Sequence, residues 1–98
     1  MYVLVQHRII DPETAFPRGE KLIRGEAAPE GVRNLQFYPS VDGDFVTCLL
    51  EAPSVEIVQK YVDATLRDSA DNTCYEVDSE QAFARHPLGL RESAALAG

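Results

Sequence analysis

Residues 32–66 read VRNLQFYPSVDGDFVTCLLEAPSVEIVQKYVDATL, and this stretch decides the fold. Two apolar runs, residues 32–39 and 44–50, lie on either side of Ser40-Val41-Asp42-Gly43. An Asp-Gly pair between two such runs predicts a β-hairpin with positive φ at both central residues of a type I′ turn. The stretch therefore begins with two antiparallel strands.

The first of these strands shows an alternation of apolar and polar residues. Successive side chains of a strand point to opposite faces of the sheet. Leu35 and Phe37 are therefore expected on one face, and Asn34, Gln36 and Tyr38 on the other. This pattern predicts one buried face and one wetter face.

A helix is predicted to follow the hairpin. Ser54 is a favourable N-cap residue, and Glu56 lies in the first turn, where the helix dipole favours an acid. Apolar side chains then recur at helical spacing through Val58, Val62 and Leu66. The end of residues 32–66 is thus a strand followed by an amphipathic helix.

The flanking segments complete the pattern. Residues 2–10 and 73–77 are predicted strands, and a helix over residues 17–27 is expected to turn Leu22, Ile23 and Ala27 toward the core. Residues 68–72 are predicted as a loop, and Ser79 is expected to cap a short helix through Arg85.

The resulting order of elements, βαββαβ, predicts a ferredoxin-like α+β fold with a four-stranded antiparallel sheet. In that topology the first and third strands are central, and both helices cover one face of the sheet. We expect a ferredoxin-like domain over residues 1–78. A tail over residues 79–98 is expected to pack on the domain or on a partner subunit, in a homodimer of the dimeric α+β barrel type.

Composition narrows the classes of partner. The chain has 98 residues and a formal net charge of -7, with 9 basic and 16 acidic residues. The basic residues are scattered, which argues against a nucleic-acid partner and against a polybasic membrane-binding surface. No apolar run approaches the roughly 18 residues of a membrane span. The start of the chain shows no signal-peptide pattern, so a cytoplasmic protein with free thiols is expected.

The segment Cys48-Leu49-Leu50-Glu51-Ala52-Pro53-Ser54-Val55-Glu56-Ile57-Val58, together with Tyr75-Glu76-Val77, resembles a family of small ferredoxin-like proteins. That family includes a nickel-binding, nickel-responsive member, and the likeness covers roughly residues 1 to 78. The resemblance implies a homodimer that binds a divalent metal, nickel or zinc, or a small ligand. The nickel site of that member is rich in histidine around the first strand, and His7 is the residue here that matches it.

Three residues are predicted metal ligands, namely His7, Cys48 and Glu51. A neutral imidazole is a common metal ligand and a proton carrier, although His7 could equally be a buried structural histidine. Cys48 and Cys74 fall on the two strands that flank the first strand, too far apart for a disulfide. They could approach a shared metal with His7, or serve as small buried hydrophobes. Glu51 could ligate a metal or anchor the turn that precedes the helix.

His7, Tyr38 and Tyr75 are the predicted ligand-binding residues. Each tyrosine could line a pocket or pack in the core or at an interface, where tyrosine is enriched. The sequence contains no Gly-x-Ser-x-Gly, phosphate-loop or dinucleotide motif. We therefore expect a non-catalytic dimeric binding protein. The alternative is a cofactor-free enzyme of the dimeric α+β barrel type, resembling an isomerase or oxygenase, in which His7 and Tyr38 handle a proton.

Overall fold

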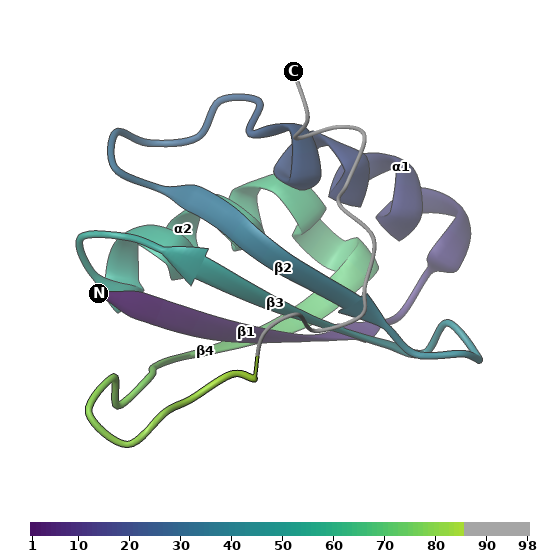
Figure 1. Cartoon of the computed structure of the whole chain (residues 1–98). Coiled ribbons are helices and arrows are strands. Elements are labelled where there is room, and N and C mark those ends of the chain that lie inside the picture. Colours follow the sequence, from purple (N-terminus) through teal and green to yellow (C-terminus); the bar gives the residue numbers. More distant parts are fainter. Residues whose placement is uncertain (86–98) are drawn as a thin grey trace.

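The computed structural model describes residues 1–85, and its elements follow the predicted order (Figure 1). The strands are β1 (Tyr2–Ile9), β2 (Arg33–Pro39), β3 (Phe45–Glu51) and β4 (Ala70–Glu76). The helices are α1 (Pro12–Arg24) and α2 (Val55–Leu66), and the 3₁₀ turn η1 (Arg67–Ser69) joins α2 to β4. The ferredoxin-like α+β fold is therefore confirmed.

The four strands form one antiparallel sheet in the order β2-β3-β1-β4. The first and third strands are central, as predicted. Both helices lie against the same face of this sheet (Figure 1). Neither α1 nor α2 has the length and apolar character that a bilayer crossing requires.

The core lies between the sheet and the helices. On β1 the side chains of Val3, Val5 and His7 are buried, and the residues between them lie on the opposite face of the sheet. The buried positions of β3 are Val46, Cys48 and Leu50, which pair with the buried positions of β1. Because paired residues share a face, the register collects these side chains under the helices.

Helix α1 begins five residues earlier than predicted. Pro12 occupies the first helical position, where its missing N–H is not needed, and the carbonyl of Asp11 accepts from the backbone N–H of Ala15 at 2.8 Å. Pro17 lies inside the helix on its exposed side, where water can reach the carbonyl that lost its donor. The helix ends at Gly25 in the left-handed region, so the expected core position of Ala27 is wrong: Ala27 is exposed and lies beyond the helix.

The hairpin forms, but its turn differs from the prediction. Gly43 has a φ of 81°, whereas Asp42 does not share the left-handed conformation that a type I′ turn needs at both central residues. The backbone N–H of Gly43 donates to Ser40 at 3.1 Å, and the N–H of Ser40 donates to Phe45 at 2.7 Å. A loop of five residues, 40–44, with a single left-handed glycine therefore connects β2 and β3.

Strand β2 contains a β-bulge that the sequence pattern did not reveal. Asn34 pairs with Leu50 and Gln36 pairs with Leu49, so Leu35 is an extra residue. The bulge shifts the alternation by one, and Asn34 and Phe37 lie on the same, helix-covered face of the sheet. The predicted face of Asn34 is therefore wrong.

In the second half of the chain, two further predictions are wrong and one is confirmed. Strand β4 starts at Ala70 rather than at Thr73, because its register with β1 continues to the pair Ile9 and Ala70. Residues 79–81 form a turn stabilised by Asp78, not a helix through Arg85. The predicted packing of the tail concerns mainly residues 86–98, which lie outside the described residues. The predicted cap is confirmed: the Ser54 hydroxyl accepts from the backbone N–H of Ile57 at 3.2 Å.

We expect Ser54→Ala to lower the free energy of unfolding by about 1 kcal/mol, because it leaves an N–H of the first turn of α2 without its side-chain acceptor. Urea denaturation followed by circular dichroism measures the change. Ser54→Asp is the control and should keep most of the stability, since aspartate caps equally well. Equal stability of the alanine and wild-type proteins would contradict the capping role.

Candidate functional site

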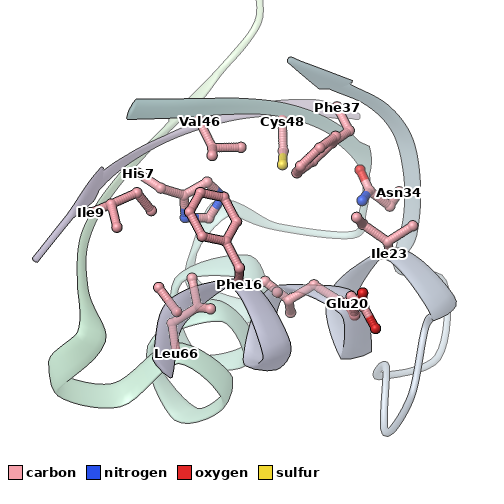
Figure 2. Close-up of a pocket in the computed structure, with 13 residues that line it drawn as sticks. His7, Ile9, Phe16, Glu20, Ile23, Asn34, Phe37, Val46, Cys48 and Leu66 are labelled. Carbon is pink, nitrogen blue, oxygen red and sulfur yellow. The ribbon is translucent and has the colours of Figure 1, made fainter. Parts of the chain in front are cut away.

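A cavity of about 220 Å³ lies between α1 and the sheet (Figure 2). Its wall is mostly apolar and is formed by α1, β1, β2, β3 and the end of α2. The lining residues are His7, Ile9, Ala15, Phe16, Gly19, Glu20, Leu22, Ile23, Asn34, Phe37, Val46, Cys48 and Leu66. A mostly apolar pocket with a few polar groups is the usual form of a small-molecule site.

Two local features of the sequence create this space. Gly19 faces the sheet from α1, and a Cβ added there would meet no atom within 4 Å. The bulge at Leu35 turns Asn34 into the cavity where regular alternation would have turned it away. Phe16 and Phe37, each 38% exposed, lie at the boundary between the cavity and solvent. A missing side chain on α1 and an extra residue in β2 thus shape the site.

His7 is the central polar group of the site. It is 2% exposed and lies on the middle strand β1, with its ring turned into the cavity (Figure 2). Its Nδ1 is 2.6 Å from Oδ1 of Asn72, the residue that pairs with it on β4. The described residues make no hydrogen bond to its Nε2.

Asn72 is in turn held by α2. Its Nδ2 donates to Oδ1 of Asp63 at 2.9 Å, and the Gln59 side chain donates to the same carboxylate at 3.1 Å and to the Asn72 carbonyl at 3.0 Å. A chain of hydrogen bonds therefore leads from the exposed carboxylate of Asp63 through Asn72 to His7. Burial lowers the pKa of His7, and the contacts with Asn72 and Asp63 only partly oppose this effect. The imidazole is consequently neutral near pH 7.

Asn34 supplies a second polar atom. Its Oδ1 is buried and lacks a hydrogen-bond partner among the described residues. A buried oxygen without a donor costs free energy, and such an atom in a native structure requires an explanation.

The three predicted metal ligands do not come together. His7 and Cys48 both line the cavity, but Glu51 pairs with Tyr2, lies on the opposite face of the sheet and forms an ion pair with Arg33 at 3.3 Å. Residues 1–85 contain no cluster of three His, Cys, Asp or Glu side chains placed to hold a metal. Burial raises the pKa of Cys48 to about 12, which disfavours the thiolate that a metal requires. Two donors of this kind do not make a metal site by themselves.

Cys74 is also a free thiol, and its position agrees with the sequence analysis. Cys48 and Cys74 both pair with Val5, one from each side of β1, so two strand spacings separate them. Burial, together with the charge of Asp63, raises the pKa of Cys74 to about 11. Neither cysteine is placed level with His7, so the predicted approach of all three to one point does not occur.

The two predicted tyrosines lie on the face of the sheet away from the helices. Tyr38 pairs with Thr47, and Tyr75 pairs with Leu4, whereas His7 belongs to the other face. Tyr38 is 36% exposed and Tyr75 is 52% exposed. The structure therefore separates both tyrosines from His7 and from the cavity.

Sequence reasoning missed Asn72, Asp63 and Asn34. The polar residues 68–72 predict a loop, although Asn72 belongs to β4. Asp63 follows the spacing of the exposed side of α2, a signal that does not distinguish a functional carboxylate from a solvated one. Asn34 could have been found only by recognising the bulge.

The fold and the cavity define a ferredoxin-like α+β protein with a small, mostly apolar pocket. No family model and no curated protein matches the sequence. Among solved structures, SCO4226 from Streptomyces coelicolor A3(2) is 25% identical, with a TM-score of 0.57 over 80% of this chain and 96% of that one. Rv0793 from Mycobacterium tuberculosis is 13% identical, with a TM-score of 0.50 over 78% of this chain and 93% of that one, a likeness of fold alone.

The lowered pKa of His7 predicts a dependence of stability on pH. Its ordinary value of 6.5 applies to the unfolded chain, which therefore binds a proton below pH 6.5 while the folded chain still excludes it. We expect full stability from this group above pH 6.5 and a progressive loss as the pH falls through the lowered pKa of the folded state. Urea denaturation at several pH values between 5.5 and 7.5, a range on either side of 6.5, measures the slope of the unfolding free energy against pH.

His7→Gln removes the titrating group and should flatten the dependence of the unfolding free energy on pH, whatever its effect on absolute stability. A slope that persists in His7→Gln would show that other groups control this pH range.

Proposed function

We propose that this chain is a binding protein for a small, mostly apolar molecule, which occupies the cavity between α1 and the sheet. The observation that carries the proposal is the pairing of an apolar space with an unused polar atom that faces it, Nε2 of His7. This nitrogen accepts a hydrogen bond when His7 donates through Nδ1 to Asn72. The ligand is therefore a molecule with an O–H or N–H group.

Size and charge narrow the ligand further. A cavity of roughly 150 Å³ lined by apolar side chains holds benzene, so 220 Å³ suits a one- or two-ring molecule. Glu20 lines the rim, Asp63 lies behind Asn72, and the whole chain carries a net charge of -7. These negative charges disfavour an anionic ligand and favour a neutral one.

A divalent metal, nickel or zinc, is a second candidate cargo, supported by the resemblance to a family with a nickel-binding member. His7 and Cys48 would be its donors at the cavity. This proposal has less support than the apolar ligand, because Glu51 is on the other face and two donors fall short of a complete set.

A cofactor-free enzyme remains the alternative to a binding protein. It is favoured by the bonded chain of Asp63, Asn72 and His7, which suits an imidazole that exchanges protons. Tyr38 has no part in this alternative, since it lies on the opposite face.

We also propose that the chain is a cytoplasmic homodimer whose subunits meet through the face of the sheet opposite the helices. This face carries Tyr38, Phe45 and Tyr75, which are 36%, 45% and 52% exposed. Aromatic side chains are enriched at interfaces. The ion pairs Arg8–Asp71 and Arg33–Glu51 belong to the same face, so it presents both signs of charge to a second copy of itself.

Indole is a suitable probe of the cavity, because it has two rings and one N–H donor and because the chain contains no tryptophan that would obscure its fluorescence. We expect wild-type protein to bind indole with a dissociation constant of roughly 0.1 to 1 mM. Gly19→Leu should abolish binding by filling the cavity and should keep the protein folded, since leucine favours helix more than glycine does.

Gly19→Ala is the matched control, which gains helix propensity but leaves most of the space and should still bind. Nickel and zinc chloride are titrated in parallel by calorimetry. Failure of wild-type protein to bind indole, or undiminished binding by Gly19→Leu, would rule out the cavity as the ligand site. Tight binding of either metal, lost in His7→Gln, would identify the metal as the cargo.

The proposed dimer predicts a native mass spectrum at twice the chain mass of 10.8 kDa. Tyr75→Lys should shift the protein to the monomer, because it places a charge on the proposed interface. Lys60→Glu changes a charge on α2, away from that face, and should leave the dimer intact. A wild-type monomer at micromolar concentration would contradict the dimer without affecting the cavity.

A further inference from the structure

The hydrogen bonds behind His7 determine which of its nitrogens carries the proton. The carboxylate of Asp63 can only accept, so the Asn72 side chain must turn its NH₂ group toward Asp63, at 2.9 Å. The amide oxygen of Asn72 then faces Nδ1 of His7 at 2.6 Å and requires a donor there. If the Asn72 amide were rotated by half a turn, its oxygen would face the Asp63 carboxylate, and the two acceptors would repel each other. The charge of Asp63 therefore fixes the orientation of the Asn72 amide.

The neutral ring therefore has its hydrogen on Nδ1 and a lone pair on Nε2. The two nitrogens of an imidazole point in roughly opposite directions. With Nδ1 directed at β4, Nε2 is directed toward the side of β1 on which the cavity lies. This is the arrangement of a histidine base, whose second nitrogen is oriented by a hydrogen-bonded partner.

We propose that His7 is a general base that removes a proton from a small neutral molecule bound in the cavity, and that Asn72 and Asp63 are positioning residues that fix its tautomer. The inference rests on the proposed ligand site. The substrate class is a compact apolar molecule with a weakly acidic C–H or O–H bond, such as a ketone with a hydrogen next to its carbonyl or a phenol.

The proton balance of this step needs no oxidant or metal. Nε2 takes the proton, and the electron pair of the broken bond stays on the substrate as an enolate or phenolate. The imidazolium formed keeps its Nδ1–H bond to Asn72, and the nearby charge of Asp63 stabilises it. Returning the proton to another atom of the substrate completes an isomerisation.

Two measurements on the full chain test the proposal. The first is the tautomer of His7, read by nitrogen NMR at neutral pH. We expect the hydrogen on Nδ1 in wild-type protein and a mixture of tautomers in Asp63→Asn, since an amide at residue 63 accepts either orientation of Asn72. Asp71→Asn is the matched control: this acid neighbours Asn72 on β4 but bonds to Arg8 on the other face. A wild-type ring with its hydrogen on Nε2 would overturn the proposal.

The second measurement uses 5-nitro-1,2-benzisoxazole, a neutral two-ring carbon acid. A base removes its C–H proton, and the electron pair of that bond forms the third bond of a nitrile. The N–O bond breaks, and its electron pair stays on the oxygen of a coloured nitrophenolate. We expect wild-type protein to open the ring at least about tenfold faster than free imidazole at equal concentration. The Asp63→Asn variant should lose most of this rate enhancement, and the Asp71→Asn variant should keep it.

His7→Gln should reduce the rate to that of buffer, and Gly19→Leu should do the same with His7 intact, so the test does not depend on one variant folding. Indole binding tests the ligand site separately from the general base. Indole binding without faster ring opening would overturn the general base and leave the ligand site standing. Absence of both would overturn the ligand site, and with it the inference that rests on it.

Discussion

The register of β1 against its two neighbours is the constraint on which the rest of the structure depends. As a central strand, β1 pairs with β3 along one edge and with β4 along the other, so each of its residues has two fixed neighbours. His7 thereby meets Val46 on one side and Asn72 on the other. A shift of one residue would move His7 and both buried valines to the outer face, which the apolar core opposes strongly.

This register explains how the polar side chain of His7 can be buried in the core. A buried imidazole needs a partner, and β4 supplies one at the paired position. Because the second nitrogen has no described partner, the fold leaves an acceptor that faces the cavity. The same contact that holds the ring in the core therefore directs its chemistry toward the ligand site.

The fold could largely be predicted from the sequence, because each element is encoded locally. The Asp-Gly turn, the Ser54 cap and the spacing of valines on α2 depend on a few adjacent residues, and they determine the order of strands and helices. The separation of Cys48 and Cys74 followed from that order alone. The helix at Pro12 was harder, since a proline can begin a helix as readily as end one, and only the burial of Ala15 and Leu22 distinguishes the two.

The candidate site was less predictable for a related reason. His7 and Cys48 are predicted correctly as neighbours on adjacent strands, because the order of the strands follows from local patterns. The bulge at Leu35 leaves no such mark, so the face of Asn34 was assigned wrongly. Tyr38 and Tyr75 were grouped with His7 by residue type, although the pleat places them on opposite faces. Contacts across strands, such as Asn72 with His7, become visible only when the register is known.

The cavity itself argues for a function, because an unfilled space reduces stability. The space of about 220 Å³ leaves the apolar side chains around it without the packing contacts that a filled core would give them. A side chain at Gly19 would restore part of these contacts and strengthen α1 as well, since a Cβ there meets nothing within 4 Å. A core packed for stability alone would therefore carry a larger residue at this position, and the glycine is better explained by a molecule that occupies the space.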